Sequence, residues 1–221
     1  MRLLVVPVLC LALSSLAGCG KDTPDTAADP AASGAPASTV SCDYPDDSTS
    51  TKAKDVAKPS ADAPQEGQVE MTISTSAGDI DITLDSDAAP CTVNSFRSLA
   101  SQGYFDDTPC HRLVPGFVLQ CGDPTGTGGG GPGYTLPNEV TGAETYGRGV
   151  LAMANVGSDP TTGGSQFFIC LADTGLDPDF TVFGTVSDAG MQVVDAIAAK
   201  GTKDNAPDGA PKEPVTITSV D

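Results

Sequence analysis

The stretch PCHRLVPGFVLQCGDPTGTGGGGPG, residues 109–133, combines the only histidine of the chain with one of its four arginines and a glycine-rich run. Two short apolar segments flank the tripeptide PGF, and a three-residue loop there would join them as a hairpin. In such a hairpin Arg112 and Gln120 would lie opposite each other on one side. An arginine in an apolar strand usually has a partner or a function, although it can also lie at an exposed edge. The stretch therefore predicts a β-rich fold and makes Arg112 the first candidate functional residue.

Three other kinds of site are disfavoured by the same stretch. A phosphate-binding loop needs a lysine and a serine or threonine that open a helix, and residues 122–133 contain no lysine. Cys110 and His111 are neighbours on an expected strand, so their side chains point to opposite faces and cannot form a nucleophile–base pair. Zinc is disfavoured because no CxxC pair accompanies the single histidine, for which we expect a structural role. We expect no metal and no cofactor.

The chain from residue 68 onward carries strand and helix patterns. Residues 69–75 and 79–84 alternate apolar and polar side chains around the turn SAGD, which predicts a hairpin. Two segments with helical spacing begin near Pro90 and at Asp188, the expected cap of the second helix. Together these patterns predict a mainly β fold, a closed eight-stranded antiparallel barrel capped by two α-helices. Further strands are expected at residues 110–114, 117–121, 149–155, 165–171, 180–186 and 215–220.

The first 19 residues, MRLLVVPVLCLALSSLAGC, resemble the export signal of a bacterial lipoprotein. Arg2 precedes an apolar run that is too short to span a bilayer, which takes about 20 apolar residues. The sequence LAGC, which ends at Cys19, resembles a lipobox, in which the signal is cut before a cysteine that then carries a lipid. We expect residues 1–18 to be a signal peptide and Cys19 the lipidation site. An extracytoplasmic protein anchored to the cell membrane by lipid follows from this resemblance.

The segment after Cys19 changes in composition. Residues 20–67 are rich in Ala, Pro, Asp, Ser and Thr, and they cannot bury enough apolar surface to offset the entropy lost on ordering. We expect a disordered tether over residues 19–67 and a folded domain over residues 68–221. Within the tether, the patch SCDYP with Cys42 and Tyr44 is the one place that could dock. The net charge of −18 disfavours nucleic acid and anionic lipid as partners, so membrane attachment would come from the lipid.

The cysteines indicate disulfides, because an export signal implies an oxidising compartment. Cys170 ends the apolar run QFFIC and is expected to be a buried small hydrophobe. Four other cysteines remain in the mature chain besides Cys19, enough for two bridges. Their three possible pairings cannot be separated by sequence. These four residues are Cys42, Cys91, Cys110 and Cys121.

Several blocks of the chain resemble, in order, the cyclophilins, which are peptidyl-prolyl cis-trans isomerases. CHRLVPGFVLQCGDPTGTGGGG is similar to their signature hairpin and loop, and GVLAMANVGSDPTTGGSQFFIC and LDPDFTVFGTV to their second and third blocks. GDIDITL and APCTVNSFRSLA resemble the first hairpin and the first helix. The resemblance covers about residues 69–221 and implies an eight-stranded barrel with two capping helices. It also implies proline-containing polypeptides as partners. We expect a monomer.

The same resemblance assigns roles to individual residues. Arg112 takes the place of the catalytic arginine. Phe117, Val118, Phe168 and Leu176 match the apolar pocket for the substrate proline. Val118 stands where methionine is common, Gly175 in the place of a tryptophan and Phe180 in the place of a histidine, so the resemblance is imperfect at the pocket. The positions that match the groove for the extended peptide are Gln120, Gly129, Gly130, Ala154, Asn155 and Gln166.

The implied reaction needs neither a proton nor a nucleophile. Rotation about an X–Pro bond is slow because resonance stiffens the peptide bond, and a guanidinium can stabilise the twisted amide without a covalent intermediate. We expect Arg112 to supply this stabilisation during folding of exported or cell-surface proteins. The alternative is a peptide-binding chaperone lipoprotein with little isomerase activity. A solute-binding lipoprotein is disfavoured, because its two α/β lobes would need a longer chain.

Overall fold

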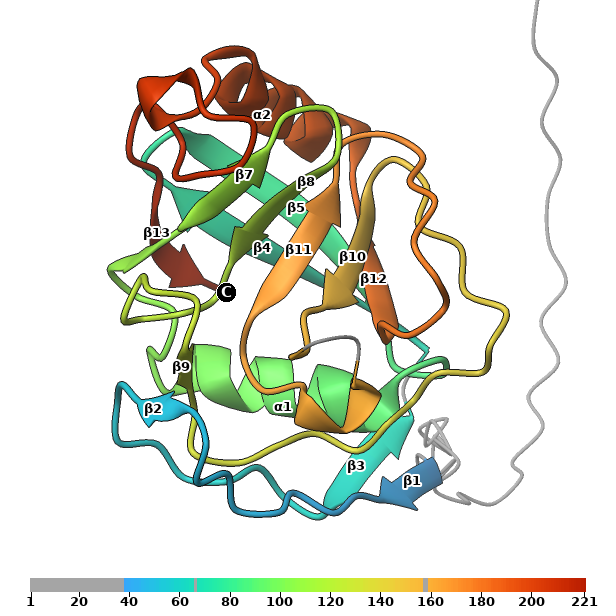
Figure 1. Ribbon diagram of the computed structural model, residues 1–221. Coiled ribbons are helices and arrows are strands. Elements are labelled where there is room, and N and C mark those ends of the chain that lie inside the picture. Colours follow the sequence, from blue (N-terminus) through green and yellow to red (C-terminus); the bar gives the residue numbers. More distant parts are fainter. Residues whose placement is uncertain (1–37, 66, 157–158) are drawn as a thin grey trace, which may run out of the picture. The chain divides into compact units, whose positions relative to one another are not determined.

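A nine-stranded antiparallel sheet dominates the computed structural model, which describes residues 38–65, 67–156 and 159–221 (Figure 1). The strand order is β6-β13-β4-β5-β12-β10-β11-β8-β7. The described residues form one compact unit around this sheet. The strands are β4 (Gln68–Thr75), β5 (Gly78–Asp85), β6 (Thr108–Pro109), β7 (Arg112–Val114), β8 (Val118–Cys121), β10 (Val150–Met153), β11 (Phe167–Cys170), β12 (Val182–Val186) and β13 (Thr216–Val220).

The prediction of a closed eight-stranded barrel is wrong, because this sheet is a nine-stranded half-barrel. Its two edge strands, β6 and β7, are separated in the chain only by Cys110 and His111, yet no ladder joins them among the described strands. The physical reason lies in β6, which is two residues long and ends at Pro109. Proline has no backbone N–H to donate to a ladder and is confined to sheet edges.

The long hairpin of β4 and β5 confirms the expected alternation. All eight residues of each strand are paired, from Gln68 with Asp85 to Thr75 with Gly78. Every second side chain of β5 faces the core, where Ile80 is 2% exposed and Ile82 and Leu84 are fully buried. Side chains of a strand alternate between faces, so one apolar stripe is enough to specify this register.

Two helices cover opposite ends of the sheet (Figure 1). Helix α1 (Pro90–Ser101) begins at the expected proline, and its Phe96 packs against Phe105, Phe167 and Phe183 with ring centroids 4.9–5.6 Å apart. Helix α2 (Asp188–Ala199) lies at the other end.

The cap of α2 differs from the prediction. Ser187, and not Asp188, is the N-cap residue, and its hydroxyl accepts a hydrogen bond from the backbone N–H of Gly190. Serine is a preferred N-cap, while an acidic residue in the first turn favours the positive end of the helix dipole. Both residues therefore stabilise the start of the helix, in adjacent positions.

Residues 38–65 differ from the predicted tether, because they form strands that pack on the domain. Strands β1 (Ser38–Ser41) and β3 (Asp62–Gln65) pair with each other, and β2 (Thr51–Lys52) pairs with β9 (Gly130–Gly131). Docking of the SCDYP patch is confirmed, since Cys42 and Tyr44 are each 6% exposed. The remaining helical elements of the described chain are the 3₁₀ segments Pro160–Thr162 and Lys203–Asn205.

The reason for this difference is a covalent cross-link that composition does not reveal. Cys42 is bonded to Cys91 at the start of α1, and the Tyr44 hydroxyl donates to the carbonyl oxygen of Cys91 at 3.0 Å. A segment with few apolar residues can thus be ordered without a large core of its own. The second bridge joins Cys110 and Cys121, and Cys170 is a buried free thiol, as predicted.

The predicted signal peptide (residues 1–18) and lipidation site (Cys19) lie outside the described residues. Within the part of the chain that the structure describes, no helix is long and apolar enough to cross a membrane.

Removal of the Cys42–Cys91 bridge tests whether it holds residues 38–65 in place. The double variant Cys42→Ser/Cys91→Ser should lose about 2–4 kcal/mol of unfolding free energy, since the bridge closes a loop of 49 residues. Protease should also cut within residues 38–65 of the folded variant. Denaturant unfolding and limited proteolysis measure the two effects. The matched control, Cys110→Ser/Cys121→Ser, should leave residues 38–65 protected, and equal cutting in both variants would contradict the assignment.

Candidate active site

The candidate site is built on one row of residues that crosses four neighbouring strands. Arg112 on β7 is opposite Gln120 on β8, Gln120 is opposite Phe168 on β11, and Phe168 is opposite Ala152 on β10. Residues opposite each other in antiparallel strands share a face and lie in contact. The expected three-residue loop at residues 115–117 is confirmed by this register, which brings Arg112 beside Gln120.

An apolar pocket of about 260 Å³ lies on this face. Val118 and Phe168 form its buried floor, at 3% and 4% exposure. Phe180 meets Phe168 edge to face, with ring centroids 5.4 Å apart and an interplanar angle of 86°. All nine lining residues were predicted from the sequence and are brought together here: Arg112, Phe117, Val118, Gln120, Ala154, Asn155, Phe168, Leu176 and Phe180.

Tyr146 supports the pocket from behind and was not predicted. Its hydroxyl donates to the carbonyl oxygen of Phe180 at 2.9 Å and accepts from the backbone N–H of the same residue at 3.0 Å. Burial raises the pKa of Tyr146, so the hydroxyl stays protonated and keeps both bonds. These contacts fix the loop that carries Phe180 against the pocket. Tyr146 lies in a segment of irregular structure, where no periodic pattern marks it.

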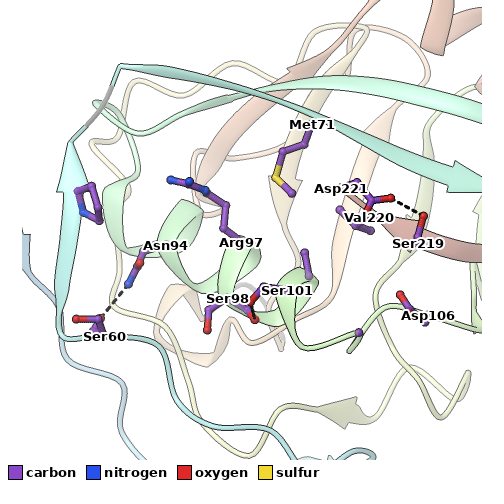
Figure 2. A pocket seen from close by; sticks show the side chains of 13 residues that line it. Ser60, Met71, Asn94, Arg97, Ser98, Ser101, Asp106, Ser219, Val220 and Asp221 are labelled. Atoms are coloured by element: carbon purple, nitrogen blue, oxygen red, sulfur yellow. Dashed lines mark hydrogen bonds between the residues drawn. The ribbon is translucent and has the colours of Figure 1, made fainter.

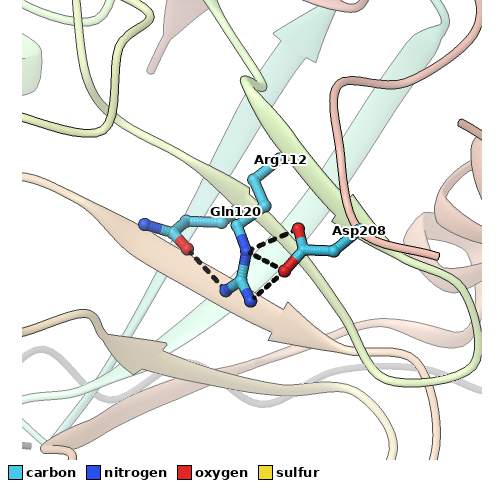
Figure 3. A network of polar contacts seen from close by, with 3 residues as sticks. All are labelled: Arg112, Gln120 and Asp208. Atoms are coloured by element: carbon cyan, nitrogen blue, oxygen red, sulfur yellow. Dashed lines mark hydrogen bonds and ion pairs between the residues drawn. The ribbon is translucent and has the colours of Figure 1, made fainter. Parts of the chain in front are cut away.

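A chain of polar side chains runs along the rim (Figure 3). The Nε of Arg112 donates to Asp208 at 2.9 Å, Nη2 donates to the same carboxylate at 2.7 Å, and Nη1 donates to Gln120 Oε1 at 3.3 Å. Gln120 Nε2 then donates to Gln166 Oε1 at 2.9 Å. The guanidinium is held on two sides and its plane is therefore fixed. Five N–H donors make up a guanidinium, so this arrangement leaves donors for a ligand.

Asp208 is the second residue that sequence reasoning missed. It lies 96 residues after Arg112, in the loop between α2 and β13. The hydrogen bond from Arg112, together with its charge, lowers the pKa of Asp208. The carboxylate is therefore ionised well below neutral pH. Both side chains are about half exposed, so the pair orients Arg112 more than it stabilises the fold.

A second pocket, of about 240 Å³, adjoins the first and shares Gln120, Ala154 and Asn155 with it. The three remaining predicted residues, Gly129, Gly130 and Gln166, line this pocket. The two pockets form one cleft that contains every candidate binding residue predicted within the domain. One wall of the second pocket was not predicted. It is formed by Asp47, Thr49 and Ser50, which belong to the upstream segment, residues 38–65.

The glycine-rich loop is organised around Asp123, a fully buried carboxylate. It accepts hydrogen bonds from the backbone N–H groups of Thr125 (2.7 Å), Gly128 (2.7 Å) and Gly130 (3.1 Å). Burial alone would raise the pKa of Asp123. The hydrogen bonds from Thr125 and from these N–H groups outweigh burial, so the net pKa is lowered. A Cβ on Gly130 would lie 1.9 Å from Asp123 Oδ1, so only glycine fits. The donors that a phosphate would need are thus occupied by the protein's own carboxylate.

His111 and Cys110 take no part in the cleft. Neither residue lines either pocket, and Cys110 is bonded to Cys121. Burial lowers the pKa of His111, which is neutral at pH 7. These observations place His111 outside the cleft, and its expected structural role stays a prediction.

A larger cavity, about 810 Å³, is separate from this cleft and contains no predicted site residue (Figure 2). It lies between α1 and the last residues of β13, with Asn94, Arg97 and Ser98 on the helix side. Its lining is mostly hydroxyl and charged groups, in contrast to the apolar pocket beside Arg112. Size alone therefore does not identify the active site of this protein.

The fold and the cleft together define the class of protein. Residues 69–221 match the family model described as cyclophilin type peptidyl-prolyl cis-trans isomerase/CLD. The chain belongs to this family.

Two mycobacterial proteins that are similar to this chain are consistent with this family assignment. The chain is 46% identical over 168 residues to "Probable peptidyl-prolyl cis-trans isomerase B" of Mycobacterium tuberculosis, covering 69% of this chain and 54% of the relative. It is 42% identical over 198 residues to the protein of the same name in Mycobacterium leprae, covering 82% and 66%. The chain thus spans about half to two thirds of these relatives.

A solved structure shows the same fold. A cyclophilin type peptidyl-prolyl cis-trans isomerase of Cryptosporidium parvum is 30% identical, with a TM-score of 0.64 over 69% of this chain and 96% of that one. A second structure of that protein, in the presence of the dipeptide Ala-Pro, has a TM-score of 0.63 and 30% identity, over 69% of this chain and 97% of that one.

The pairing of Arg112 with Asp208 can be tested by titration. Arg112→Leu should raise the pKa of Asp208 toward the ordinary value of an aspartate, because the donor and its charge are both removed. NMR of the carboxyl carbons across acidic pH measures this pKa. Asp195, which forms a similar pair with Arg148, is the internal control and should keep its lowered pKa. An Asp208 pKa that does not move would show that the pair is absent in solution.

Proposed function

We propose that this protein is a peptidyl-prolyl cis-trans isomerase that acts on X–Pro bonds of exported or cell-surface polypeptides. The observation that carries the proposal is the position of Arg112, a fixed guanidinium at the edge of an apolar pocket of about 260 Å³. The family match and the names of the relatives support the same activity.

The chemistry of the reaction requires little beyond positioning. The peptide bond has a rotation barrier of about 18–20 kcal/mol, and X–Pro bonds exchange between cis and trans over tens of seconds or longer. A catalyst must bind the twisted amide better than either planar form. As the amide twists, its nitrogen regains a lone pair and becomes a hydrogen-bond acceptor. A donor already aimed at that nitrogen therefore lowers the barrier.

In this cleft Arg112 would be that donor. Asp208 and Gln120 hold the guanidinium from two sides, so no reorganisation of the side chain is needed when the amide twists. The floor of Val118 and Phe168 would hold the proline ring, while the acyl side of the bond turns beneath Arg112. We call Asp208 a positioning residue, since it acts through Arg112 alone.

Replacement of Arg112 tests the mechanism. Arg112→Ala should lower kcat/KM about 100-fold or more, which corresponds to roughly 2.7 kcal/mol of transition-state stabilisation. Arg112→Lys should restore little, because an ammonium on a flexible stem lacks the planar fork. A protease-coupled assay with X–Pro peptides measures turnover, and circular dichroism confirms folding.

Two matched controls separate this mechanism from its rivals. Arg148→Ala removes an arginine with a similar aspartate pair outside the cleft and should keep full turnover. His111→Gln should leave a flat rate profile between about pH 6 and pH 8, because rotation transfers no proton. Normal turnover by folded Arg112→Ala would remove Arg112 from the mechanism. Peptide binding by the wild type without turnover would instead favour a chaperone with little isomerase activity.

Export and lipid anchoring form the second part of the proposal. The LAGC sequence supports a lipid on Cys19 after removal of residues 1–18. Independent support comes from the two disulfides of the domain, Cys42–Cys91 and Cys110–Cys121, because such bridges persist in oxidising compartments outside the cytosol. The proposed site of action is therefore the extracytoplasmic face of the cell membrane, and the proposed clients are proteins that fold there.

Substitution of the proposed lipidation site tests the anchoring. In the native host, the wild type should sediment with membranes, and Cys19→Ala should keep its signal peptide and lose its lipid. Mass spectrometry of the purified proteins detects both changes. Cys170→Ala serves as the control, because that thiol is buried inside the domain. Processing and lipid content unchanged in Cys19→Ala would show that the anchor lies elsewhere.

A further inference from the structure

One wall of the cleft comes from a part of the chain that the family model does not include. The model begins at residue 69, whereas Asp47, Thr49 and Ser50 line the second pocket. The glycine-rich loop and Gln166 line the same pocket. A ligand in the second pocket would therefore meet residues of the upstream segment, residues 38–65, which precede the part of the chain that the family model matches.

Backbone contacts hold this wall rigidly against the loop. Strand β2 lies beside β9 as a parallel pair (Figure 1). The backbone N–H of Thr51 donates to the carbonyl oxygen of Gly129 at 2.9 Å, and that of Asp47 donates to Gly133 at 3.0 Å. A Cβ on Gly131 would lie 2.7 Å from Ser50 Oγ, so the two segments are in close contact. The wall and the loop thus form a preformed pocket.

The wall carries a negative charge. Asp47 Oδ1 accepts hydrogen bonds from the N–H of Thr49 at 2.7 Å and from its hydroxyl at 2.6 Å. Burial alone would raise the pKa of Asp47. The hydrogen bonds from Ser50 and Thr49 outweigh burial, so the pKa is lowered to about 2. The carboxylate is therefore ionised at any physiological pH.

The lysines of the same segment bond elsewhere and do not neutralise Asp47. Lys52 pairs with Asp55 at 2.6 Å, and Lys58 pairs with Asp46 at 2.8 Å. Lys54 donates to backbone carbonyl oxygens near the end of α1. Asp47 is left as the carboxylate at the rim of the second pocket, where it is partly exposed.

The position of the pocket determines what reaches it. Because the two pockets share Gln120, Ala154 and Asn155, a peptide with its proline in the first places a nearby side chain in the second. At about 240 Å³ the second pocket is smaller than the range of whole-ligand sites, about 300–1,000 Å³. We propose that Asp47 makes the second pocket selective for peptides that carry a lysine or arginine close to the proline. This specificity rests on the proposed isomerase function.

The experiment compares peptides and variants of the mature full-length protein. Lysine or glutamate is placed at each position from three residues before to two residues after the proline, and kcat/KM is measured at low salt. At one or two positions the wild type should prefer lysine over glutamate at least about fivefold. Asp47→Asn should reduce this ratio below about twofold. Asparagine can keep the turn that Asp47 forms with Thr49, so the change removes mainly charge.

A matched control separates a local contact from the acidic field of the whole protein. Asp43→Asn removes the same charge from the same segment, but Asp43 does not line the pocket, so the ratio should stay at the wild-type value. A ratio that is unchanged in Asp47→Asn, or lost equally in Asp43→Asn, overturns the inference.

Failure of the inference can be told from failure of the proposed function. If the wild type turns over an unsubstituted Ala-Pro peptide but shows no preference for lysine at any position, the specificity is wrong and the isomerase function stands. If no peptide is turned over, the isomerase function is wrong and the specificity falls with it.

Discussion

The register between β7, β8 and β11 is the constraint on which the rest of the site depends. It places Arg112, Gln120 and Phe168 side by side on one face, so a charged donor, a polar link and an apolar floor meet within three strands. A shift of one residue would turn all of them to the opposite face. The tight loop at residues 115–117 and the Cys110–Cys121 bridge both bind this hairpin at its ends, which makes such a shift costly. The cleft is therefore a product of sheet pairing more than of loop conformation.

The parts of the site that sequence could predict are those encoded in local patterns. Alternation and the spacing of the turn predict that Arg112 faces Gln120, and the signature blocks place Phe168 and Phe180 at the same pocket. Asp208 and Asp47 were missed for a common reason. Each belongs to an irregular segment far along the chain from its contacts, and nothing in its neighbours indicates which surface it meets. The closed barrel was predicted from the number of strands and helices and from the family resemblance, and neither takes account of a proline at the edge.

Two carboxylates beside this cleft have different uses. Asp123 is fully buried, and its carboxylate accepts hydrogen bonds from the glycine-rich loop, whose shape it determines. Asp208 is about half exposed and directs one side chain that faces the ligand. Removal of the first would leave several backbone N–H groups without a partner and should disturb the fold of the loop. Removal of the Asp208 carboxylate should change only the conformational freedom of the Arg112 side chain. The two carboxylates that support this cleft therefore differ in their effect, according to how far each is buried.

The ordered segment that begins at Ser38 shortens the stretch of chain between the proposed lipid on Cys19 and the folded part of the protein. A fully extended chain spans at most about 3.3–3.6 Å per residue, so the 49 steps from Cys19 to Gln68 could cover about 170 Å. Because folding takes up residues 38–65, only the 19 steps from Cys19 to Ser38 remain, and their limit is about 65 Å. An anchored isomerase of this kind would serve chains in a thin layer next to the bilayer, where newly exported polypeptides emerge, and would leave more distant ones untouched.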